Sequence, residues 1–432
     1  MPLTHMIIRY PRYKIDVSEL RTFWNSPILN SYMSICKLGL DQDATTLAVN
    51  TYFDLIDTVG TKPDVLYLCS NGELDRAVFL EATGLIPEEV KFYQYGEMNA
   101  LLTIKETCSN VGAAFLVVDV PKGKDDGTDV YCSGAAVGGY SGEERGLELV
   151  ETTDLPPLMG METRLDGRVF SPSVENALID SITAISKDEG KLFANVANLK
   201  AASRKIKNFE SEGSKRFGFA GIATGLSSFI YFIENSFTPD QNLTLVAVEE
   251  AGGIAMHFRG KNPPPVVKSI PTFNLDGAGF LMRRGMPQGN VSIPQGAYIS
   301  TPIYFAEKEA RYRLRSAICD NCGLVHFPPR RICKDCGSPT KPSDPLPRRG
   351  RLYTFTQILK GAAPTEFDLQ QRLEGEYCVG IIEFETGPRV ISQLTDVNIQ
   401  DLNIGDEMKM VFRKIYHQDG MDRYGYKFTK LT

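Results

Sequence analysis

Short apolar segments alternate with helical patterns over about the first 260 residues of the chain. Runs of mainly apolar residues predict buried strands at Met6–Ile8, Val65–Cys69, Ala113–Val120, Leu192–Val196 and Leu243–Val248. Apolar residues at helical spacing, with polar residues at their starts, predict helices at Asp16–Trp24, Asp41–Val59, Glu97–Val111, Asn176–Ile185, Lys200–Phe209 and through Phe229–Ile233. Strand–helix alternation in both halves predicts a pseudo-duplicated, layered α/β domain with covered sheets over residues 1–260.

Two local signals refine this pattern. Asp41 and Asp43 both stand at the predicted start of the helix that ends at Val59, where a carboxylate can cap the first turn. The cluster of small residues at Gly134–Gly139 is expected to precede a turn.

Beyond residue 260 the pattern changes twice. Residues 261–310 are rich in Pro and Gly and predict an irregular linker, followed by a connecting helix at Ile303–Leu314. Residues 346–432 hold five strand-like runs, at Leu352–Ile358, Tyr377–Glu385, Arg389–Leu394, Met408–Ile415 and Tyr424–Lys430. Five short strands in this length favour a small all-β Greek-key barrel of the OB-fold type.

Between the linker and the barrel, residues 311–345 contain two Cys-x-x-Cys pairs. Cys319 and Cys322 precede Cys333 and Cys336 by ten intervening residues. Two residues between cysteines allow a tight turn to aim both thiolates at one ion, so the spacing predicts a structural zinc ribbon. Two disulfides or unrelated thiols are the alternatives, and His326 is a further possible ligand, although four thiolates already close the site.

Composition narrows the function classes. The 47 basic and 53 acidic residues give a net charge of −6, which offers no electrostatic reason to expect nucleic acid. No segment approaches the length of an apolar membrane helix, and the N-terminus has no signal-like pattern. The remaining five of nine cysteines are scattered, as buried free thiols in a reducing compartment would be, at Cys36, Cys69, Cys108, Cys132 and Cys378. We expect a cytoplasmic protein with no membrane and no nucleic-acid partner.

The C-terminal segment resembles a known family. The sequences CDNCGLVHFPPRRICKDCGS, GRLYTFTQI and GPRVISQLTDVNIQDLNIGDEMKMVF are similar to those of zinc-ribbon/OB-fold proteins that associate with thiolases and other acyl-CoA enzymes. The resemblance covers about Tyr312–Thr432. It implies a domain that bridges enzymes and holds coenzyme A (CoA). OB barrels also bind single strands, but this barrel segment shows no basic aromatic stripe.

The N-terminal segment, about Ile7–Arg259, resembles hydroxymethylglutaryl-CoA synthases of the thiolase superfamily. The matching stretches are YPRYKIDVSEL, GLDQDATTLAVNTYFDLI, PDVLYLCSNGEL and VYCSGAAVGGYSGE, in the family's order. The resemblance implies a layered α/β fold and a homodimer. It also implies a cysteine nucleophile at a helix N-terminus, a histidine and a glutamate.

Those family residues are missing from the matching positions. Gln94 stands at the cysteine position, Asn195 at the histidine position, Asn71 at the glutamate position and Phe219 at a later asparagine position. Asparagine can donate a hydrogen bond but cannot shuttle a proton near neutral pH.

A basic helix preserves one family feature. Lys200 matches a lysine that contacts CoA in the family, and Arg204 follows on the same helix, so both are candidate CoA-binding residues. A solvated basic helix face is the alternative interpretation.

We therefore expect a catalytically degenerate scaffold or CoA-handling subunit that works with a thiolase-type partner in a hetero-oligomer. An active synthase-like, retro-Claisen or aldol catalyst of the acyl-CoA C-acyltransferase type is the alternative. It would have to use non-standard residues such as Glu73, Glu97, Asn195 or His257. A pure interaction module without a ligand is the third class.

Overall fold

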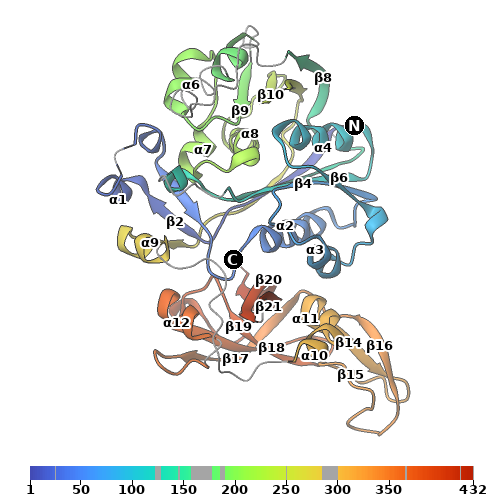
Figure 1. Cartoon of the computed structure of the whole chain (residues 1–432). Coiled ribbons are helices and arrows are strands. Elements are labelled where there is room, and N and C mark those ends of the chain that lie inside the picture. The colour runs from blue at the N-terminus through green and yellow to red at the C-terminus, as the bar shows by residue number, and fades with distance from the viewer. Residues whose placement is uncertain are drawn as a thin grey trace. The chain divides into compact units, whose positions relative to one another are not determined.

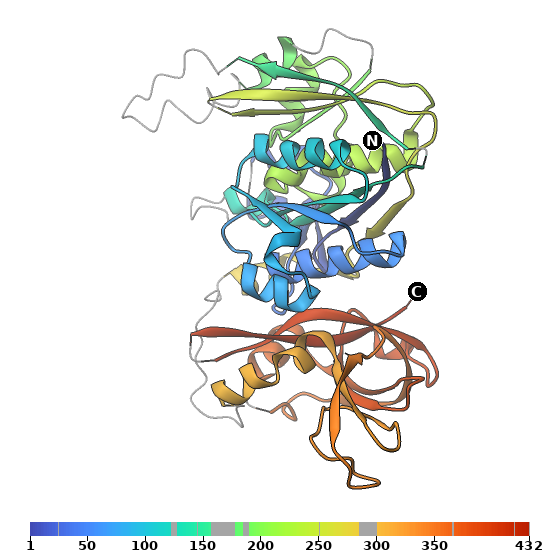
Figure 2. The ribbon, with the colours of Figure 1, turned by 90° about the vertical axis from the view of Figure 1, so that its right-hand side faces the viewer.

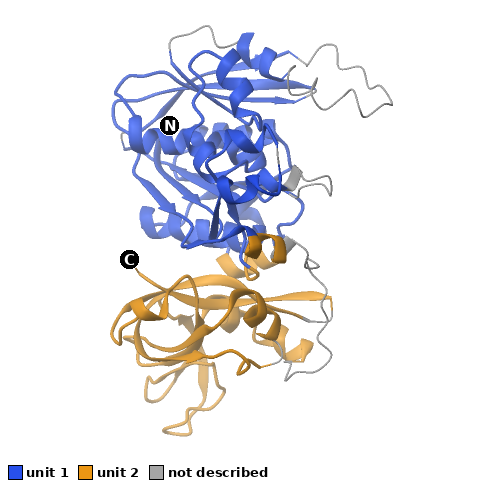
Figure 3. Cartoon of the chain, turned by 90° about the vertical axis from the view of Figure 1, so that its left-hand side faces the viewer, with its two compact units in different colours: residues 1–39, 43–76, 85–277 blue, residues 40–42, 77–84, 278–432 orange. Residues whose placement is uncertain are grey.

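The structure is a computed structural model, and it describes the chain except residues 25, 122–127, 145, 157–177, 185–189, 250, 285–299, 365–366, 419 and 432. The described residues form two compact units (Figure 3). Unit 1 holds residues 1–39, 43–76 and 85–277, and unit 2 holds residues 40–42, 77–84 and 278–432. Within the described residues, the longest apolar helices fall short of what a membrane crossing requires.

Unit 1 is built on a six-stranded sheet. Its strand order is β12 (Val266–Ser269), β1 (Leu3–Arg9), β7 (Ala135–Ser141), β6 (Ala113–Asp119), β4 (Val65–Ser70) and β5 (Val90–Tyr93). The three strands β6, β4 and β5 run parallel. All seven residues of β6 are buried, as expected for a strand covered on both faces.

The segment Gly134–Gly139, which the sequence predicted to precede a turn, lies largely within the central strand β7. A Cβ atom on Gly139 would lie 2.4 Å from the Phe115 ring, so the small side chain is required for strand packing. We predicted no strand at this segment from its apolar content, because glycine is usually depleted in strands.

Unit 1 also contains a second sheet of four strands. Its order is β8 (Glu148–Leu155), β11 (Gly252–Arg259), β10 (Leu243–Glu249) and β9 (Lys191–Ala194). Helices α4 (Glu97–Ser109) and α8 (Thr224–Ser236) pack between the two sheets and share one apolar core with them. Helix α2 (Ala44–Val59) covers the six-stranded sheet, and α6 (Leu199–Lys205) covers the four-stranded sheet (Figures 1 and 2). The resulting five layers confirm the predicted layered α/β fold.

Smaller elements complete unit 1. A three-stranded sheet joins β13 (Phe273–Asn274), β2 (Tyr13–Asp16) and β3 (Ser34–Lys37). The short helices are α1 (Val17–Arg21) and α7 (Glu212–Phe217). Because β12 pairs with β1 and β13 pairs with β2, part of the segment expected to be an irregular linker is ordered sheet, and unit 1 extends to Gly277.

Helix α2 begins later than the sequence suggested. Asp43 is its N-cap, and its carboxylate accepts a hydrogen bond from the Thr46 amide at 2.8 Å. The helix ends at Gly60, whose φ of 81° fits the left-handed conformation of a helix C-terminus. Asp41 does not cap this helix and belongs to unit 2 instead.

Unit 2 contains a small sheet and a barrel. The sheet orders β15 (Val325–His326), β14 (Arg315–Cys319) and β16 (Thr340–Pro345). The closed barrel orders β17 (Arg349–Ile358), β18 (Tyr377–Glu383), β19 (Arg389–Leu394), β21 (Met421–Lys430) and β20 (Glu407–Gln418), which confirms the predicted five-stranded all-β fold.

Five helices complete the description of unit 2 and its boundary, namely α3 (Arg76–Thr83), α9 (Gly277–Arg284), α10 (Thr301–Ala306), α11 (Lys308–Arg313) and α12 (Asp368–Glu374). The single helix expected at Ile303–Leu314 is thus two short helices separated by Glu307.

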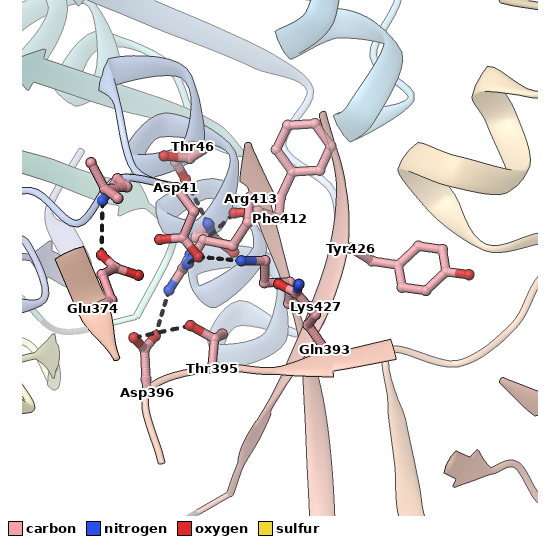
Figure 4. Close-up of polar contacts among 12 residues, drawn as sticks. Asp41, Thr46, Glu374, Gln393, Thr395, Asp396, Phe412, Arg413, Tyr426 and Lys427 are labelled. Atoms are coloured by element: carbon pink, nitrogen blue, oxygen red, sulfur yellow. Dashed lines mark hydrogen bonds and ion pairs between the residues drawn. The ribbon is translucent and has the colours of Figure 1, made fainter. Parts of the chain in front are cut away.

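The barrel of unit 2 holds buried charges (Figure 4). The Lys427 ammonium lies 2.8 Å from the Asp41 carboxylate, and an Arg413 guanidinium nitrogen lies 2.5 Å from Asp396. Asp41, Arg413 and Lys427 are at most 5% exposed. Buried charges that lose their partner are strongly destabilising, so the barrel requires Asp41.

We predict that Asp41→Ala destabilises unit 2 by about 3 kcal/mol, because it leaves Lys427 without its buried counter-ion. Denaturant titration of the full chain, followed by hydrogen exchange of barrel amides, measures this change. The matched control is Asp368→Ala, which removes an exposed ion pair with Arg372 and should cost less than about 0.5 kcal/mol. Equal effects of the two substitutions would contradict the role of Asp41.

Candidate functional site

The four cysteines of the two Cys-x-x-Cys pairs converge in unit 2. Their sulfur atoms all lie within 4.8 Å of one another, with Cys319 and Cys336 at 3.4 Å and Cys322 and Cys333 at 3.6 Å. These separations suit the edges of a tetrahedron around an ion with metal–sulfur bonds of about 2.3 Å. All four thiols are free, so the arrangement is not a pair of disulfides.

Two matching turns create this geometry. The Gly323 amide donates to the Cys319 carbonyl at 3.1 Å, and the Gly337 amide donates to the Cys333 carbonyl at 3.2 Å. Both glycines have φ near +70°, which other residues adopt at a cost. The donor set of four thiolates fits zinc and leaves no position for a substrate. His326 lies on β15 and is buried, outside the converging group of four sulfurs.

A second group of polar residues lies in unit 1, at the carboxyl ends of parallel strands. Asn71 follows β4, Tyr95 follows β5 and Asp119 ends β6. In the four-stranded sheet, Asn195 follows β9 and Glu249 ends the parallel strand β10. Ligand sites in α/β folds form outside the carboxyl ends of parallel strands, so this position is the expected one for a functional site.

Asp119 is the centre of the first part of this group. Its carboxylate is fully buried and accepts hydrogen bonds from the Asn71 amide at 3.0 Å, the Tyr95 hydroxyl at 2.9 Å and the Ile222 amide at 3.0 Å. Burial raises the pKa of Asp119 to about 6, against the opposing effect of these hydrogen bonds. Gly221 is required beside it, because a Cβ atom there would lie 1.9 Å from the carboxylate.

Glu97 and Glu249 occupy the N-terminus of α4. The Met98 amide in the first turn of this helix donates to the Glu249 carboxylate at 3.2 Å. Burial, and then the neighbouring charge of Glu249, raise the pKa of Glu97 to about 8, although Asn195 and the Val248 backbone hydrogen-bond its carboxylate. A carboxylate therefore occupies the positive end of the helix dipole, where a thiolate would have to be stabilised in an acyl-transfer enzyme.

The thiols of unit 1 are buried. Cys69 lies nearest to the start of α4, where its sulfur donates to the Gln94 carbonyl at 3.4 Å. Burial raises the pKa of Cys69, Cys36 and Cys108 to about 12 in each case. Cys132 is also buried. A raised pKa favours the protonated form of Cys69, Cys36 and Cys108 near neutral pH, and the protonated form of a thiol is a poor nucleophile.

The structure brings together only some of the residues singled out from the sequence. Asn71, Asn195 and Glu97 belong to the group at the strand ends. Gln94 is exposed, and Phe219 packs edge-on against Tyr131 with ring centres 6.2 Å apart.

Four further candidates are at least partly exposed. Glu73 is exposed, and the His257 ring pairs with Thr244 across β11 and β10. Lys200 and Arg204 are exposed on α6, where they remain candidates for binding CoA phosphates.

Sequence analysis missed three residues of this site, Tyr95, Asp119 and Glu249, as functional candidates. Each ends or follows an apolar strand. A polar residue directly after a buried parallel strand was the signal that could have found them.

Comparisons with known proteins place unit 2 in a family. The family model described as the ChsH2 rubredoxin-like zinc ribbon domain matches residues 306–341, and that of the ChsH2 C-terminal OB-fold domain matches residues 344–413. A DUF35 domain-containing scaffold protein of Methanocaldococcus jannaschii is 38% identical over 124 residues, 28% of this chain and 84% of that protein. The chain therefore belongs to the DUF35 domain-containing family.

Two further similarities extend the comparison. The benzoylsuccinyl-CoA thiolase subunit BbsA of Thauera aromatica is 28% identical over 127 residues, 29% of this chain and 81% of that subunit. A crystal structure of HMG-CoA synthase complexed with CoA is 13% identical, with 61% of this chain and 83% of that chain covered at a TM-score of 0.50. This likeness confirms the thiolase-like fold.

We predict that one zinc ion binds per chain and that Cys333→Ser abolishes this binding, because three thiolates no longer close the tetrahedron. Metal analysis of purified protein is the measurement, with loss of ribbon structure and retention of the unit 1 fold as the expected consequences. Cys378→Ser, which removes a buried barrel thiol outside the group, should leave zinc content unchanged. Less than half an equivalent of zinc in carefully prepared wild-type protein would count against the site.

We predict that the free energy of unfolding declines as pH rises from about 6 to about 8 and that Glu97 causes this decline. Its folded-state pKa of about 8 exceeds the unfolded value, so the folded chain keeps a proton that the unfolded chain has already lost. The stabilisation is complete below the unfolded pKa and is lost as pH rises through the folded pKa. Glu97→Gln should remove a decline on the order of 2 kcal/mol between these pH values.

The measurement is the free energy of unfolding between pH 6 and pH 8.5. Asp119, whose pKa is about 6, titrates at the lower end of this range in wild type and variant alike, so the difference between the two proteins reports Glu97. Glu106→Gln on the same helix is the matched control and should keep the wild-type decline. An identical decline in wild type and Glu97→Gln would show that Glu97 is ionised throughout this range.

Proposed function

We propose that this chain is a CoA-handling subunit of an acyl-CoA-processing assembly, with a thiolase-type partner that makes or breaks the carbon–carbon bond. Its own thiolase-like unit does not form an acyl-enzyme. The two parts of this proposal rest on different observations. The thiolase-type partner is inferred from the family of unit 2. The absence of a covalent step is inferred from the residues at the start of α4.

The absence of a covalent step is supported mainly by the Glu249 carboxylate at the N-terminus of α4. The Met98 amide donates a hydrogen bond to this carboxylate. A side chain of the chain itself therefore occupies the helix N-terminus, which is the position that would stabilise a thiolate. The nearest thiol, Cys69, has a pKa raised to about 12 and donates to a backbone carbonyl. Together these features oppose thioester formation near neutral pH.

The partner is proposed from similarity. Relatives that share the zinc ribbon and OB barrel include a DUF35 domain-containing scaffold protein and a thiolase subunit by name. We infer that unit 2 docks on a thiolase-type enzyme and that its four thiolates hold a structural zinc ion. Enclosing a thioester excludes water and fixes the pantetheine arm, which favours reaction at the partner's nucleophile.

Unit 1 would then hold CoA or an acyl-CoA without reacting with it. Lys200 and Arg204 are exposed cations on one helix and could bind the phosphates of CoA. The synthase resemblance also suggests a homodimer of this chain within the larger assembly.

An active catalyst is the second candidate, and Glu97 is the observation that favours it. With a pKa near 8, this carboxyl group is protonated at neutral pH and could act as a general acid beside Asn195. Such a catalyst would work through proton transfer in a retro-aldol or condensation reaction and would need no acyl-enzyme.

We predict that a thiolase-type partner purified without this chain has low activity and that adding the full chain raises its turnover at least severalfold. Turnover of acyl-CoA with and without the chain, at micromolar concentrations, is the measurement. The Cys333→Ser variant should fail to activate because its ribbon is unfolded, whereas Cys378→Ser should activate fully. Full activity of the partner alone, together with no measurable association, would refute this division of labour.

A further inference from the structure

We propose that the basic loop of the zinc ribbon, residues 330–334, binds the acidic edge strand β8 of a second copy of this chain. The contact joins two different surfaces of the same protein through opposite charges. It does not depend on the proposed function, because it needs neither a CoA ester nor a thiolase-type partner.

The two parts of the chain carry opposite net charges. Residues 1–277 hold 25 basic and 36 acidic residues, whereas residues 278–432 hold 22 basic and 17 acidic residues. The basic excess is greatest around the zinc ribbon, where residues 311–351 hold ten basic and three acidic residues. Surfaces of opposite charge steer one another into contact and fix their register. A second copy of the chain therefore carries the counter-charge for the ribbon.

The cations of the basic loop are exposed and unpaired. Elsewhere in the ribbon, Lys341 has a counter-ion in Asp320 at 3.0 Å. Arg330, Arg331 and Lys334 are exposed, and they form no ion pair with any residue that the structure describes. The Ile332 side chain between them is 56% exposed. Covering this loop with an acidic surface would pair the cations and also remove apolar area from water.

The backbone of the basic loop is already ordered. The Thr340 amide donates to the Arg331 carbonyl at 3.0 Å, and the Thr340 hydroxyl donates to the Arg330 carbonyl. The Cys333 amide donates to the Ser338 carbonyl at 2.8 Å. Because an ordered loop loses less conformational entropy on binding than a flexible one, this loop is preorganised for a protein surface.

Strand β8 offers the complementary surface. It lies at the edge of the four-stranded sheet, and its exposed Glu148, Glu151 and Asp154 form no ion pair within the described part of the chain. Val150 lies among them and is 64% exposed. Like charges prevent two such edge strands from pairing with each other. The same carboxylates attract the basic loop, whose exposed apolar residue matches Val150.

The test is sedimentation velocity of the full chain at micromolar concentrations. Attraction between exposed charges is strong at low ionic strength and is screened at high salt. We expect self-association to weaken about tenfold between about 50 mM and about 500 mM salt. At low salt, Arg330→Glu combined with Arg331→Glu should weaken it about as much, and so should Glu148→Arg combined with Glu151→Arg.

A mixture of these two variants tests whether the two surfaces meet. In the mixture, the reversed loop of one variant carries the opposite charge to the reversed strand of the other, and the two unchanged surfaces are also complementary. Association should therefore return to within about threefold of wild type, although neither variant associates well alone.

The matched control is Lys360→Glu combined with Arg372→Glu. It makes the same change in net charge at two exposed residues outside the ribbon, and it should keep the association of wild type. Thermal melts and zinc content establish that each variant is folded. Glutamine at the same positions replaces any charge reversal that does not fold, and it should still weaken association severalfold.

Wild-type protein without salt-dependent self-association would overturn this inference and leave the proposed function standing. Loss of association in both reversed variants without recovery in their mixture would overturn the pairing of these two surfaces. Binding of a single-stranded oligonucleotide through Arg330 and Arg331, without self-association, would assign the loop to nucleic acid and overturn the proposal as well.

Discussion

The buried carboxylate of Asp119 is the interaction on which the centre of unit 1 depends. It ends one strand and accepts hydrogen bonds from the residues that follow two neighbouring strands and from the Ile222 amide before α8. A buried carboxylate must be satisfied by donors, so these segments are fixed relative to one another. The same constraint orients the Tyr95 hydroxyl and the Asn71 amide toward Asp119.

A second carboxylate, that of Glu249, lies at the first turn of α4 in the thiolase-like fold. The Glu249 carboxylate accepts a hydrogen bond from the Met98 amide in the first turn of α4. Burial, and then the charge of Glu249, raise the pKa of Glu97. A fold does not determine a function, because the function lies in the groups placed at a site. Among the described residues, this site holds the carboxyl groups of Glu97 and Asp119 and the thiol of Cys69, and burial raises the pKa of each of the three. These features suit non-covalent binding and proton transfer.

The sequence predicted the architecture because its strongest patterns are local. The Cys-x-x-Cys pairs, the five strand runs of the barrel and the α/β alternation each follow from residues close together in the chain. The predictions that were wrong depended on distant contacts. Asp41 was placed at a helix start, but its partners Lys427 and Arg413 lie more than 370 residues away. Gly139 was not assigned to a strand, because the Phe115 ring that excludes a larger residue there lies on another strand. Tyr95 and Glu249 were missed because only folding brings strand ends together.

The central claim is that unit 1 is a thiolase-like fold that binds acyl thioesters without becoming acylated. Intact-mass measurement of the full chain after incubation with acetyl-CoA at neutral pH tests it most directly. We expect an unchanged mass, because burial raises the pKa of Cys69 and Cys108 and a carboxylate lies at the start of α4. An added acetyl group that maps to Cys69, Cys108 or Cys132 would contradict it.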